Sequence, residues 1–448
     1  MRSIALSRSV FGCARISLIR AALLVGTTLI AANARAQLTE TSQPPGSQSE
    51  GMEHKETPTS LRALVQEAEQ NNPQIAAAYH GAQAARYVPK QVSALPETQV
   101  SVQQFSVGSP RPFAGYSNSD FAYIGFAASQ DIPFPGKRDL RARVAEHGAE
   151  SLEAQTDSVR LSVVGNLKMV YFRLAYIQQT LDVLERSDQL LKQVQEAAEA
   201  RYRVGQGNQQ DVLKAQLQHT KILQEVAHHH QEQGLLEAQL KQLLGRPQES
   251  PDIVTETLRL RVLPFTAAEL LQRAREQNPD VRSSQASTRQ QETQVELAHK
   301  NFRPDFNLQY AYQHTNGDTR DYYVATFGIR LPNRGRQKAE LAEAQQNQER
   351  ARRELDAESQ RVLSEVQQQY VRAKTSEDRL KIYSDGLLPQ SDVTFRSALA
   401  EYQSNRQGFE SLLSSFLDVL NLDLEYRNEL VEHESALAEL ERLTGVSL

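Results

Sequence analysis

The chain has 448 residues, of which 39% are hydrophobic and none is tryptophan, and its mean hydropathy is −0.55. A compact core for a chain of this length normally needs more apolar side chains, so the composition disfavours ordinary globular domains and is typical of long helices with a narrow apolar face. The formal net charge of −5 disfavours a nucleic-acid partner, because proteins that bind nucleic acid present a basic face.

Residues 1–36 have the pattern of a secretory signal peptide. Four arginines precede the 12-residue apolar segment AALLVGTTLIAA (21–32), and Ala34-Arg35-Ala36 forms a small-x-small cleavage box. A membrane anchor is the alternative, but a spanning helix needs ~20 apolar residues. Removal of this segment takes away the only cysteine, Cys13, and leaves 45 basic and 55 acidic residues. We therefore expect an exported protein without disulfides or thiolate metal sites, for which oligomerisation is a source of stability.

Residues 37–58 are polar and rich in Pro, Gly, Ser and Thr, and we expect them to form a disordered lead-in. The chain then repeats itself. LVQEAEQNNPQI (64–75) returns as LLQRAREQNPDV (270–281), IPFPGK (132–137) as LPNRGR (331–336), and YRVGQGN (202–208) as YQSNRQG (402–408). Because these landmarks recur in the same order, the sequence predicts a tandem duplication, with a first repeat over 59–250 and a second over 266–448.

Each repeat is predicted to contain two short helices, two strands, a long helix, a break and a further helix. The strands are expected at about 97–107 and 120–132, and at about 305–314 and 321–331. Alternation is clearest in the second repeat, where Phe306, Leu308 and Tyr310 share one face of a strand. Each strand has about ten residues, the length that crosses a bilayer when tilted. Aromatic residues gather near strand ends and loops, as in a membrane girdle: Phe105, Phe113, Tyr116, Phe121, Tyr123, Tyr310, Tyr312, Tyr322 and Tyr323. A small soluble sheet with one wet face is the alternative.

A helix of roughly 95 Å is predicted from residue 137 to residue 200, because this segment contains no proline. Its apolar positions are spaced as in a coiled-coil seam, and they are Val163, Leu167, Val170, Leu174, Ile177, Leu181, Leu184 and Leu191. A second long helix is predicted from residue 338 to about residue 383. A single protomer is not expected to bury so long a seam well, so neighbouring helices are implied.

Two strand-to-helix corners are predicted, and their residues are Pro133, Pro135, Gly136, Pro332 and Gly335. Proline ends a strand because it cannot donate to the sheet ladder, and glycine permits a sharp turn. Basic residues follow each corner, although cations are unfavourable at the N-terminus of a helix. Attraction to phosphate or lipid head groups and simple solvation are the two explanations that the sequence leaves open.

Four strands cannot close a barrel, and open strand edges are not tolerated in lipid. At this point the chain, from about residue 59 to its end, resembles the TolC-type outer-membrane factor family of trimeric channel-tunnels. The resemblance rests on the duplicated order of elements, the Asn-Pro breaks, the Pro-Gly corners and YRVGQGNQQDVLKAQ (202–216). It implies a mainly α-helical fold with a twelve-stranded membrane β-barrel, four strands from each of three protomers, and long periplasmic coiled-coil helices. The corner IPFPGKR (132–138) is most similar to the CzcC-like branch, which serves heavy-metal efflux.

The resemblance implies a passive outer-membrane duct, a homotrimer that docks through a periplasmic adaptor protein onto an inner-membrane resistance-nodulation-division pump, with no enzymatic activity and no cofactor. The family closes its periplasmic end by drawing helix ends together, and the matching positions are Tyr202, Asp211, Tyr402, Arg406, Ser411 and Ser414. Asp211 has an equally simple explanation as an acid that complements a helix dipole. The adaptor is expected at the tip, at Val204, Gly205, Gly207, Asn208, Asn405 and Gly408. Many members carry a lipid on an N-terminal cysteine, which the mature part of this chain lacks.

Three histidines in a row, His228 to His230, suggest a metal site, with His219 nearby. Consecutive residues on a helix point about 100° apart, so a solvated helix face is the favoured interpretation. Enzyme signatures are missing from the sequence. The alternatives that the sequence leaves open are a drug-efflux or type I secretion channel and, from another class, a soluble periplasmic coiled-coil scaffold.

Overall fold

The computed structural model describes residues 58–111, 114, 119–318 and 320–446. The expected signal peptide, almost all of the expected lead-in, Phe113 and Tyr116 lie outside the described residues. The first half contains α1 (Leu61–Asn71), α2 (Pro73–Ser93), β1 (Gln99–Phe105), β2 (Tyr123–Ile132), α3 (Lys137–Arg203) and α4 (Gln209–Leu244). The second half contains α5 (Ala267–Gln277), α6 (Pro279–Lys300), β3 (Asp305–Thr315), β4 (Asp321–Arg330), α7 (Arg334–Ile382), the π-helical turn η2 (Tyr383–Leu387), α8 (Leu388–Gln403) and α9 (Phe409–Thr444).

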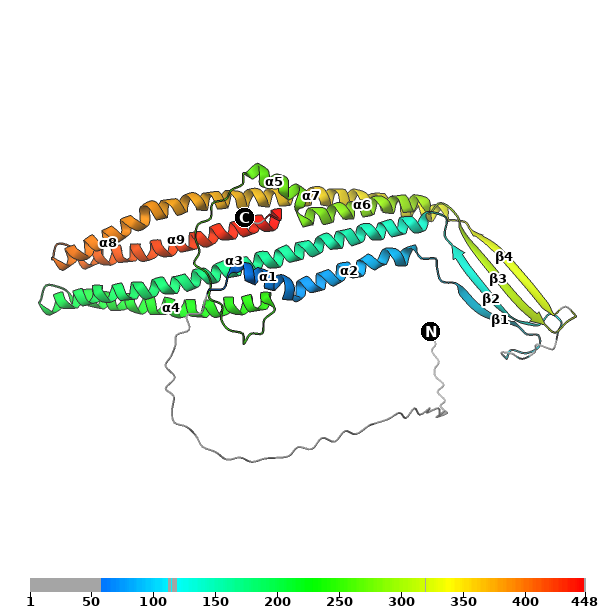
Figure 1. The fold of residues 1–448 in the computed structure, drawn as a ribbon, viewed down its shortest axis with the longest axis horizontal. Coiled ribbons are helices and arrows are strands. Elements are labelled where there is room, and N and C mark those ends of the chain that lie inside the picture. The colour runs from blue at the N-terminus through cyan, green and yellow to red at the C-terminus, as the bar shows by residue number, and fades with distance from the viewer. Residues whose placement is uncertain (1–57, 112–113, 115–118, 319, 447–448) are drawn as a thin grey trace, which may run out of the picture. The chain divides into compact units, whose positions relative to one another are not determined.

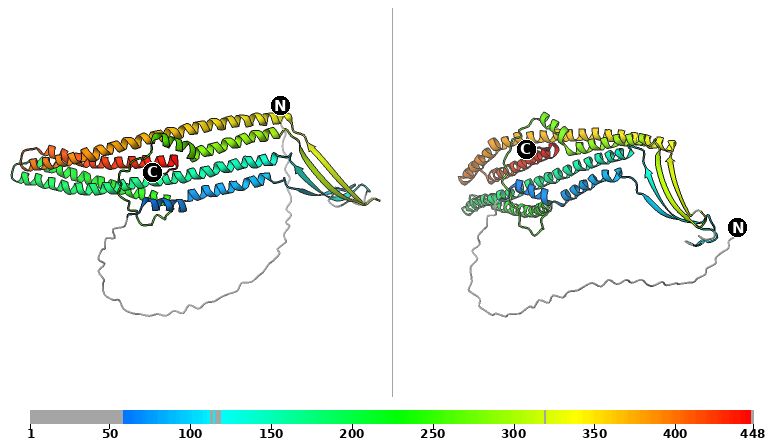
Figure 2. Two further views of the ribbon diagram at one scale, coloured as in Figure 1. Left: turned by 45° about the horizontal axis from the view of Figure 1, so that its top comes forward. Right: turned by 45° about the vertical axis from the view of Figure 1, so that its right-hand side comes forward.

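The helices run side by side, and the sheet follows the ends of α2, α3, α6 and α7 (Figures 1 and 2). At the opposite end, α3 turns back into α4 and α8 turns back into α9. The connector between α4 and α5 crosses the helices at mid-length, beside α1. The described part of the chain is therefore divided into three parts. They are a sheet, a belt of short helices (α1, α2, α5 and α6), and two long hairpins (α3 with α4, and α7 and α8 with α9).

The two Asn-Pro breaks fold in the same way. Asn72 caps α2, since its side-chain oxygen accepts hydrogen bonds from the next backbone N–H groups and Pro73 occupies the first helical position. Its side-chain nitrogen donates to the carbonyl oxygen of Leu243 at 2.8 Å, at the end of α4. Asn278 caps α6 and donates to the carbonyl oxygen of Leu443 at 3.0 Å, at the end of α9. Each asparagine therefore attaches the start of a short helix to the end of a long hairpin.

The four strands form one antiparallel sheet in the order β1-β2-β3-β4. The register aligns Val102, Phe126, Tyr312 and Tyr323 across the sheet, so they share a face. This apolar face is exposed, and Phe327 on it is 65% exposed. The opposite face is mainly polar. The alternation expected for the second repeat is confirmed by the register and extends to β1 and β2.

The two strand-to-helix corners differ in their backbone. Gly136 precedes α3 with a φ of +84°, in the left-handed region that L side chains avoid. Gly335 instead lies inside the first turn of α7, and the N-cap residue of this helix is Asn333. The Asn333 side chain accepts hydrogen bonds from Gly335 N and Arg336 N. The second corner therefore depends on an asparagine cap, and the expectation that Gly335 permits the turn is wrong.

Replacing Gly136 with alanine is expected to lower the free energy of unfolding by about 1–2 kcal/mol, because the left-handed conformation costs a residue with a Cβ atom that much. The matched change Gly335→Ala should be neutral or slightly stabilising, since alanine is favoured over glycine within a helix. Thermal unfolding of the purified variants distinguishes the two corners. Equal losses for both variants would contradict the assigned backbone.

The basic residue after the first corner is buried. Lys137 is 3% exposed, and its ammonium group donates to Asp305 Oδ1 at 2.8 Å and to the carbonyl oxygen of Arg303 at 2.9 Å. The same carboxylate accepts from Phe134 N at 2.8 Å. Attraction to Asp305 therefore explains why the Lys137 cation occupies the unfavourable N-terminal end of α3. Neither of the two explanations from the sequence, lipid head groups or solvation, is needed for this residue.

The long seam of α3 is buried within the single chain. Of its expected positions, all except Leu181 are buried, and they pack on α4, α9 and the belt. Near the turns, Leu184 and Leu191 lie in one apolar cluster with Leu412 and Phe416 of α9. The expectation that one protomer cannot bury this seam well is therefore wrong, because other helices of the same chain, from both halves, supply the neighbours.

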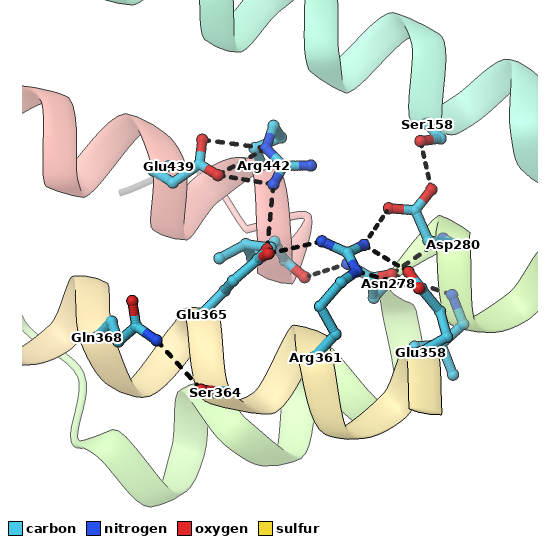
Figure 3. Close-up of polar contacts among 12 residues, drawn as sticks. Ser158, Asn278, Asp280, Glu358, Arg361, Ser364, Glu365, Gln368, Glu439 and Arg442 are labelled. Carbon is cyan, nitrogen blue, oxygen red and sulfur yellow. Dashed lines mark hydrogen bonds and ion pairs between the residues drawn. The ribbon is translucent and has the colours of Figure 1, made fainter. Parts of the chain in front are cut away.

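At the belt, polar contacts join four helices (Figure 3). Arg361 of α7 lies 2.7 Å from Glu365 Oε1 and 3.5 Å from Asp280 Oδ2 of α6. Ser158 of α3 donates to the other oxygen of Asp280, and Arg442 of α9 lies 3.6 Å from Glu365. Individual exposed ion pairs contribute little, but this network links the short helices to both long hairpins.

Further along α7, Glu377 is buried between Lys374 and Lys381 at 2.9 and 3.2 Å. Burial alone would raise the pKa of Glu377, but the two lysines lower it below its ordinary value. The ionised form therefore stabilises the fold above pH ~4.3, and this contribution is lost as the pH falls through the lowered pKa. We expect Glu377→Gln to cost about 1–2 kcal/mol at pH 7.

The cost of Glu377→Gln should shrink in thermal unfolding measured at progressively lower pH. Asp378→Asn is the control. Asp378 is adjacent in sequence, its side chain is largely exposed, and its carboxylate is as far as 4.0 Å from the Lys381 ammonium group, so little loss of stability is expected. A cost for Glu377→Gln that stays constant from pH 7 to pH 3 would rule out this linkage.

Candidate functional site

The candidate site is the end of the molecule where the two long hairpins turn. Residues 204–208 connect α3 to α4, and residues 404–408 connect α8 to α9. Gly205 has a φ of +71° and Asn405 a φ of +61°. Both turns therefore contain one left-handed residue, and asparagine is among the few side chains that tolerate this conformation. The two turns lie side by side, because Arg201 at the end of α3 contacts Tyr402 and Asn405 of the other hairpin.

Arg201, in the last turn of α3, connects the two hairpins. Its guanidinium group donates to the carbonyl oxygens of Tyr402 at 2.9 Å and Gln206 at 3.0 Å, and to the side chain of Asn405. It also lies 4.4 Å from the centre of the Tyr402 ring, in cation–π contact. One cation thus joins the turn of its own hairpin to the turn of the other.

Tyr402 is the buried centre of this contact. It is 1% exposed, and its ring packs edge-to-face on Phe409 with centroids 5.8 Å apart. Burial and the nearby Asp211 carboxylate raise the pKa of Tyr402, and Arg201 partly opposes them. The hydroxyl group therefore stays protonated at neutral pH.

A polar cavity of about 530 Å³ lies between the turns. Asp211, in the first turn of α4, is part of its wall together with Lys214 and Glu410, which form an ion pair between the hairpins. Because Asp211 also lies at a helix N-terminus, its charge complements the helix dipole as well. Both interpretations of Asp211 are compatible with its position.

The structure brings only some of the expected gate residues together. Tyr402 and Asp211 line the same cavity, whereas Tyr202 is 48% exposed and Arg406 and Ser414 are also exposed. Ser411 accepts a hydrogen bond from the side chain of Gln407, within its own hairpin.

Sequence reasoning missed Arg201, Lys214 and Glu410, which make the charged contacts between the hairpins. Their repeat counterparts are Glu401, Ser414 and Gln210. A comparison of the two repeats for positions where the charge differs could have found them.

The expected docking residues form the outer surface of the turns. Val204 is 68% exposed, and Gly205, Gly207, Asn208, Asn405 and Gly408 lie in the same two turns. Phe409, the first residue of α9 after these turns, is buried against Tyr402 and is not part of this surface. The available surface therefore includes the turn backbones, Val204 and the exposed polar side chains of the turns, such as Arg406.

The histidine-rich segment of α4 offers no metal site in the described residues. No three His, Cys, Asp or Glu side chains gather there or elsewhere among them in a way that could hold an ion. His219 instead contacts Asp188 of α3, and His229 lies 3.5 Å from Glu232. None of the helices in the described ranges has the length and apolar character needed to cross a membrane.

Comparison with known proteins identifies the family of the chain. The model of the outer membrane efflux protein family matches residues 64–246 and 270–441, well over half of the chain. No curated protein sequence matched. Among solved structures, the outer-membrane channel OprN is 17% identical with a TM-score of 0.73, covering 86% of this chain and 89% of its own.

Two further solved structures, one of an outer membrane protein and one of an outer membrane channel, have the same fold. VceC of Vibrio cholerae is 19% identical with a TM-score of 0.73, covering 86% of this chain and 96% of its own. The CmeC outer membrane channel of Campylobacter jejuni is 15% identical with a TM-score of 0.73, covering 91% and 94%. With both halves matched by the family model and the fold shared along nearly the whole described chain, the protein belongs to the outer membrane efflux protein family.

Proposed function

We propose that three copies of this chain form the outer-membrane duct of a tripartite efflux system. The observation that carries the proposal is the sheet, whose apolar face is exposed while its opposite face is polar. Such a sheet is unfavourable in water, but it suits a barrel with lipid outside and water inside.

Closure of the barrel is proposed to come from neighbouring copies. Within one chain, β1 and β4 are the two edges of the sheet, and open edges are not stable in lipid. Pairing β1 of one copy with β4 of the next gives twelve strands from three copies. The helices α2 and α4 lie on the β1 side, and α7 and α8 lie on the β4 side (Figure 1). Each pair has exposed apolar side chains available to a neighbour: Tyr87 and Leu235 in the first pair, Ile382 and Val393 in the second.

The remaining organisation follows the same proposal. Residues 1–36 act as the export signal, and two tandem repeats, 59–250 and 266–448, supply equivalent halves of each protomer. The strands then lie in the outer membrane of a Gram-negative bacterium, and the helices extend into the periplasm. The duct is passive and has no enzymatic role.

The turns at the hairpin ends are proposed to be both the gate and the docking surface. Tyr202, Asp211, Tyr402, Arg406, Ser411 and Ser414 surround the gate, with Arg201 as its principal link. A periplasmic adaptor protein is expected to contact the exposed turn residues and to connect the duct to an inner-membrane resistance-nodulation-division pump, which supplies the energy. This assignment is supported by the exposure of Val204 and by the polar cavity between the turns.

Heavy-metal cations are proposed as the cargo, on the similarity of IPFPGKR to the CzcC-like branch. The test is deletion of the gene, followed by growth titrations with zinc, cobalt, nickel, cadmium, copper and silver salts and with dyes and detergents. Sensitivity to metals alone is expected. Sensitivity to organic compounds would reassign the duct to drug efflux, and unchanged growth in both panels would favour a secretion role.

A further inference from the structure

Charge on the polar face of the sheet is confined to the end next to the helices. The register assigns Asp131, Asp305 and Arg330 to this face, within two residues of where their strands begin or end. The other strand positions on the face are uncharged, with amide, hydroxyl, small or aromatic side chains and the aliphatic Val324. Any discrimination by charge on this face therefore depends on one narrow zone.

Within that zone, Asp305 is already neutralised. Its carboxylate is bound by the buried Lys137 ammonium group at 2.8 Å. Lys137 has only 3% of its side chain exposed, so this pair presents little net charge to water.

Asp131 and Arg330 form the accessible pair. One Arg330 Nη lies 3.3 Å from both carboxylate oxygens of Asp131, and Asn307 donates to Asp131 Oδ1 at 2.9 Å. The Asp131 side chain is 38% exposed and the Arg330 side chain is 68% exposed. Two strands that are not neighbours, β2 and β4, thus contribute one negative and one positive charge to the same place, across Asn307 of β3.

We propose that Asp131 and Arg330 form a charge-balanced pair that determines the ion selectivity of the duct where the barrel meets the helices. The inference rests on the proposed function, in which the polar face lines the lumen and three copies bring three such pairs into a ring. Rings of charged side chains select ions by sign. A balanced ring discriminates weakly, whereas a ring that has lost one partner acquires the sign of the other.

The test is to measure the reversal potential of the purified full-length protein in planar lipid bilayers under a potassium chloride gradient. Arg330→Gln should shift the permeability ratio severalfold toward potassium, and Asp131→Asn should shift it toward chloride. The double variant should return close to the wild-type value, and Arg330→Lys should retain it. Asp321→Asn is the matched control, because Asp321 lies in the same sheet on the opposite, apolar face and should cause no shift.

The outcomes separate the two proposals. Opposite shifts for the two single variants, with none for Asp321→Asn, support the inference. Conducting channels whose reversal potential is unchanged in both single variants, or changes equally in Asp321→Asn, would overturn the inference and leave the duct intact. Wild-type protein that assembles but does not conduct would overturn the proposed function itself. The two single variants are expected to shift the permeability ratio in opposite directions. Either variant therefore decides the question if the other fails to assemble.

Discussion

Replacing Arg201 with glutamine is expected to loosen the closed end of the hairpins without unfolding the protein. The change removes a cation–π contact of about 0.5–2 kcal/mol and weakens hydrogen bonds at a partly exposed turn, where glutamine and water replace part of the bonding. These contacts join the turn of one hairpin to Tyr402 and Asn405 of the other. The apolar cluster that holds the hairpins together above the turns is untouched.

The expected readout is a severalfold rise in open time or mean conductance in planar bilayers, with an unchanged unfolding temperature to within a few degrees. Arg203→Gln is the matched control, because Arg203 lies two residues further along the same helix and is exposed. Equal effects of the two substitutions would show that the open time depends on the total positive charge near the turns and not on the specific contacts of Arg201.

Replacing Lys137 with methionine is expected to be the most destabilising single change, at about 3–5 kcal/mol, because it leaves a partly buried carboxylate without its cation. Asp305 would retain only the hydrogen bond from Phe134 N among its contacts at this corner. Since this corner joins β2 to α3 and contacts β3, we expect little folded protein in the membrane fraction and a lower unfolding temperature for what remains.

Two variants test the cause. Lys338→Met removes an exposed lysine from the first turns of α7 and should change stability by no more than about 0.5 kcal/mol. The double variant Lys137→Met with Asp305→Asn should be more stable than Lys137→Met alone, because the unpaired charge is gone. A double variant as unstable as the single one would mean that lost packing, and not the orphaned carboxylate, causes the damage.

Local sequence rules were sufficient for much of the fold. Asn-Pro fixes the start of α2 and α6 because asparagine caps a helix and proline suits its first turn. Alternation in β3 and β4 assigned the sheet faces, because side chains on a strand have a period of two. Both features depend only on neighbours in sequence.

The contacts between repeats could not be predicted in this way. Lys137 and Asp305 are 168 positions apart, and Arg201 and Tyr402 are 201 apart. No periodicity links such residues, since their proximity results from how the two halves pack. The same packing explains why the α3 seam is buried by its own chain. The sequence does not reveal the role of Gly335, because a similar corner can turn through an asparagine N-cap as well as through a left-handed glycine.

A chain that forms a water-filled duct through the outer membrane will conduct ions, so conductance of the purified protein is measured in planar lipid bilayers. We expect discrete conductance steps from a trimer, and an Arg201→Gln variant that stays open longer. Protein that is recovered as a folded monomer in the soluble periplasmic fraction, and that leaves the bilayer silent, would contradict the account and favour a soluble coiled-coil scaffold.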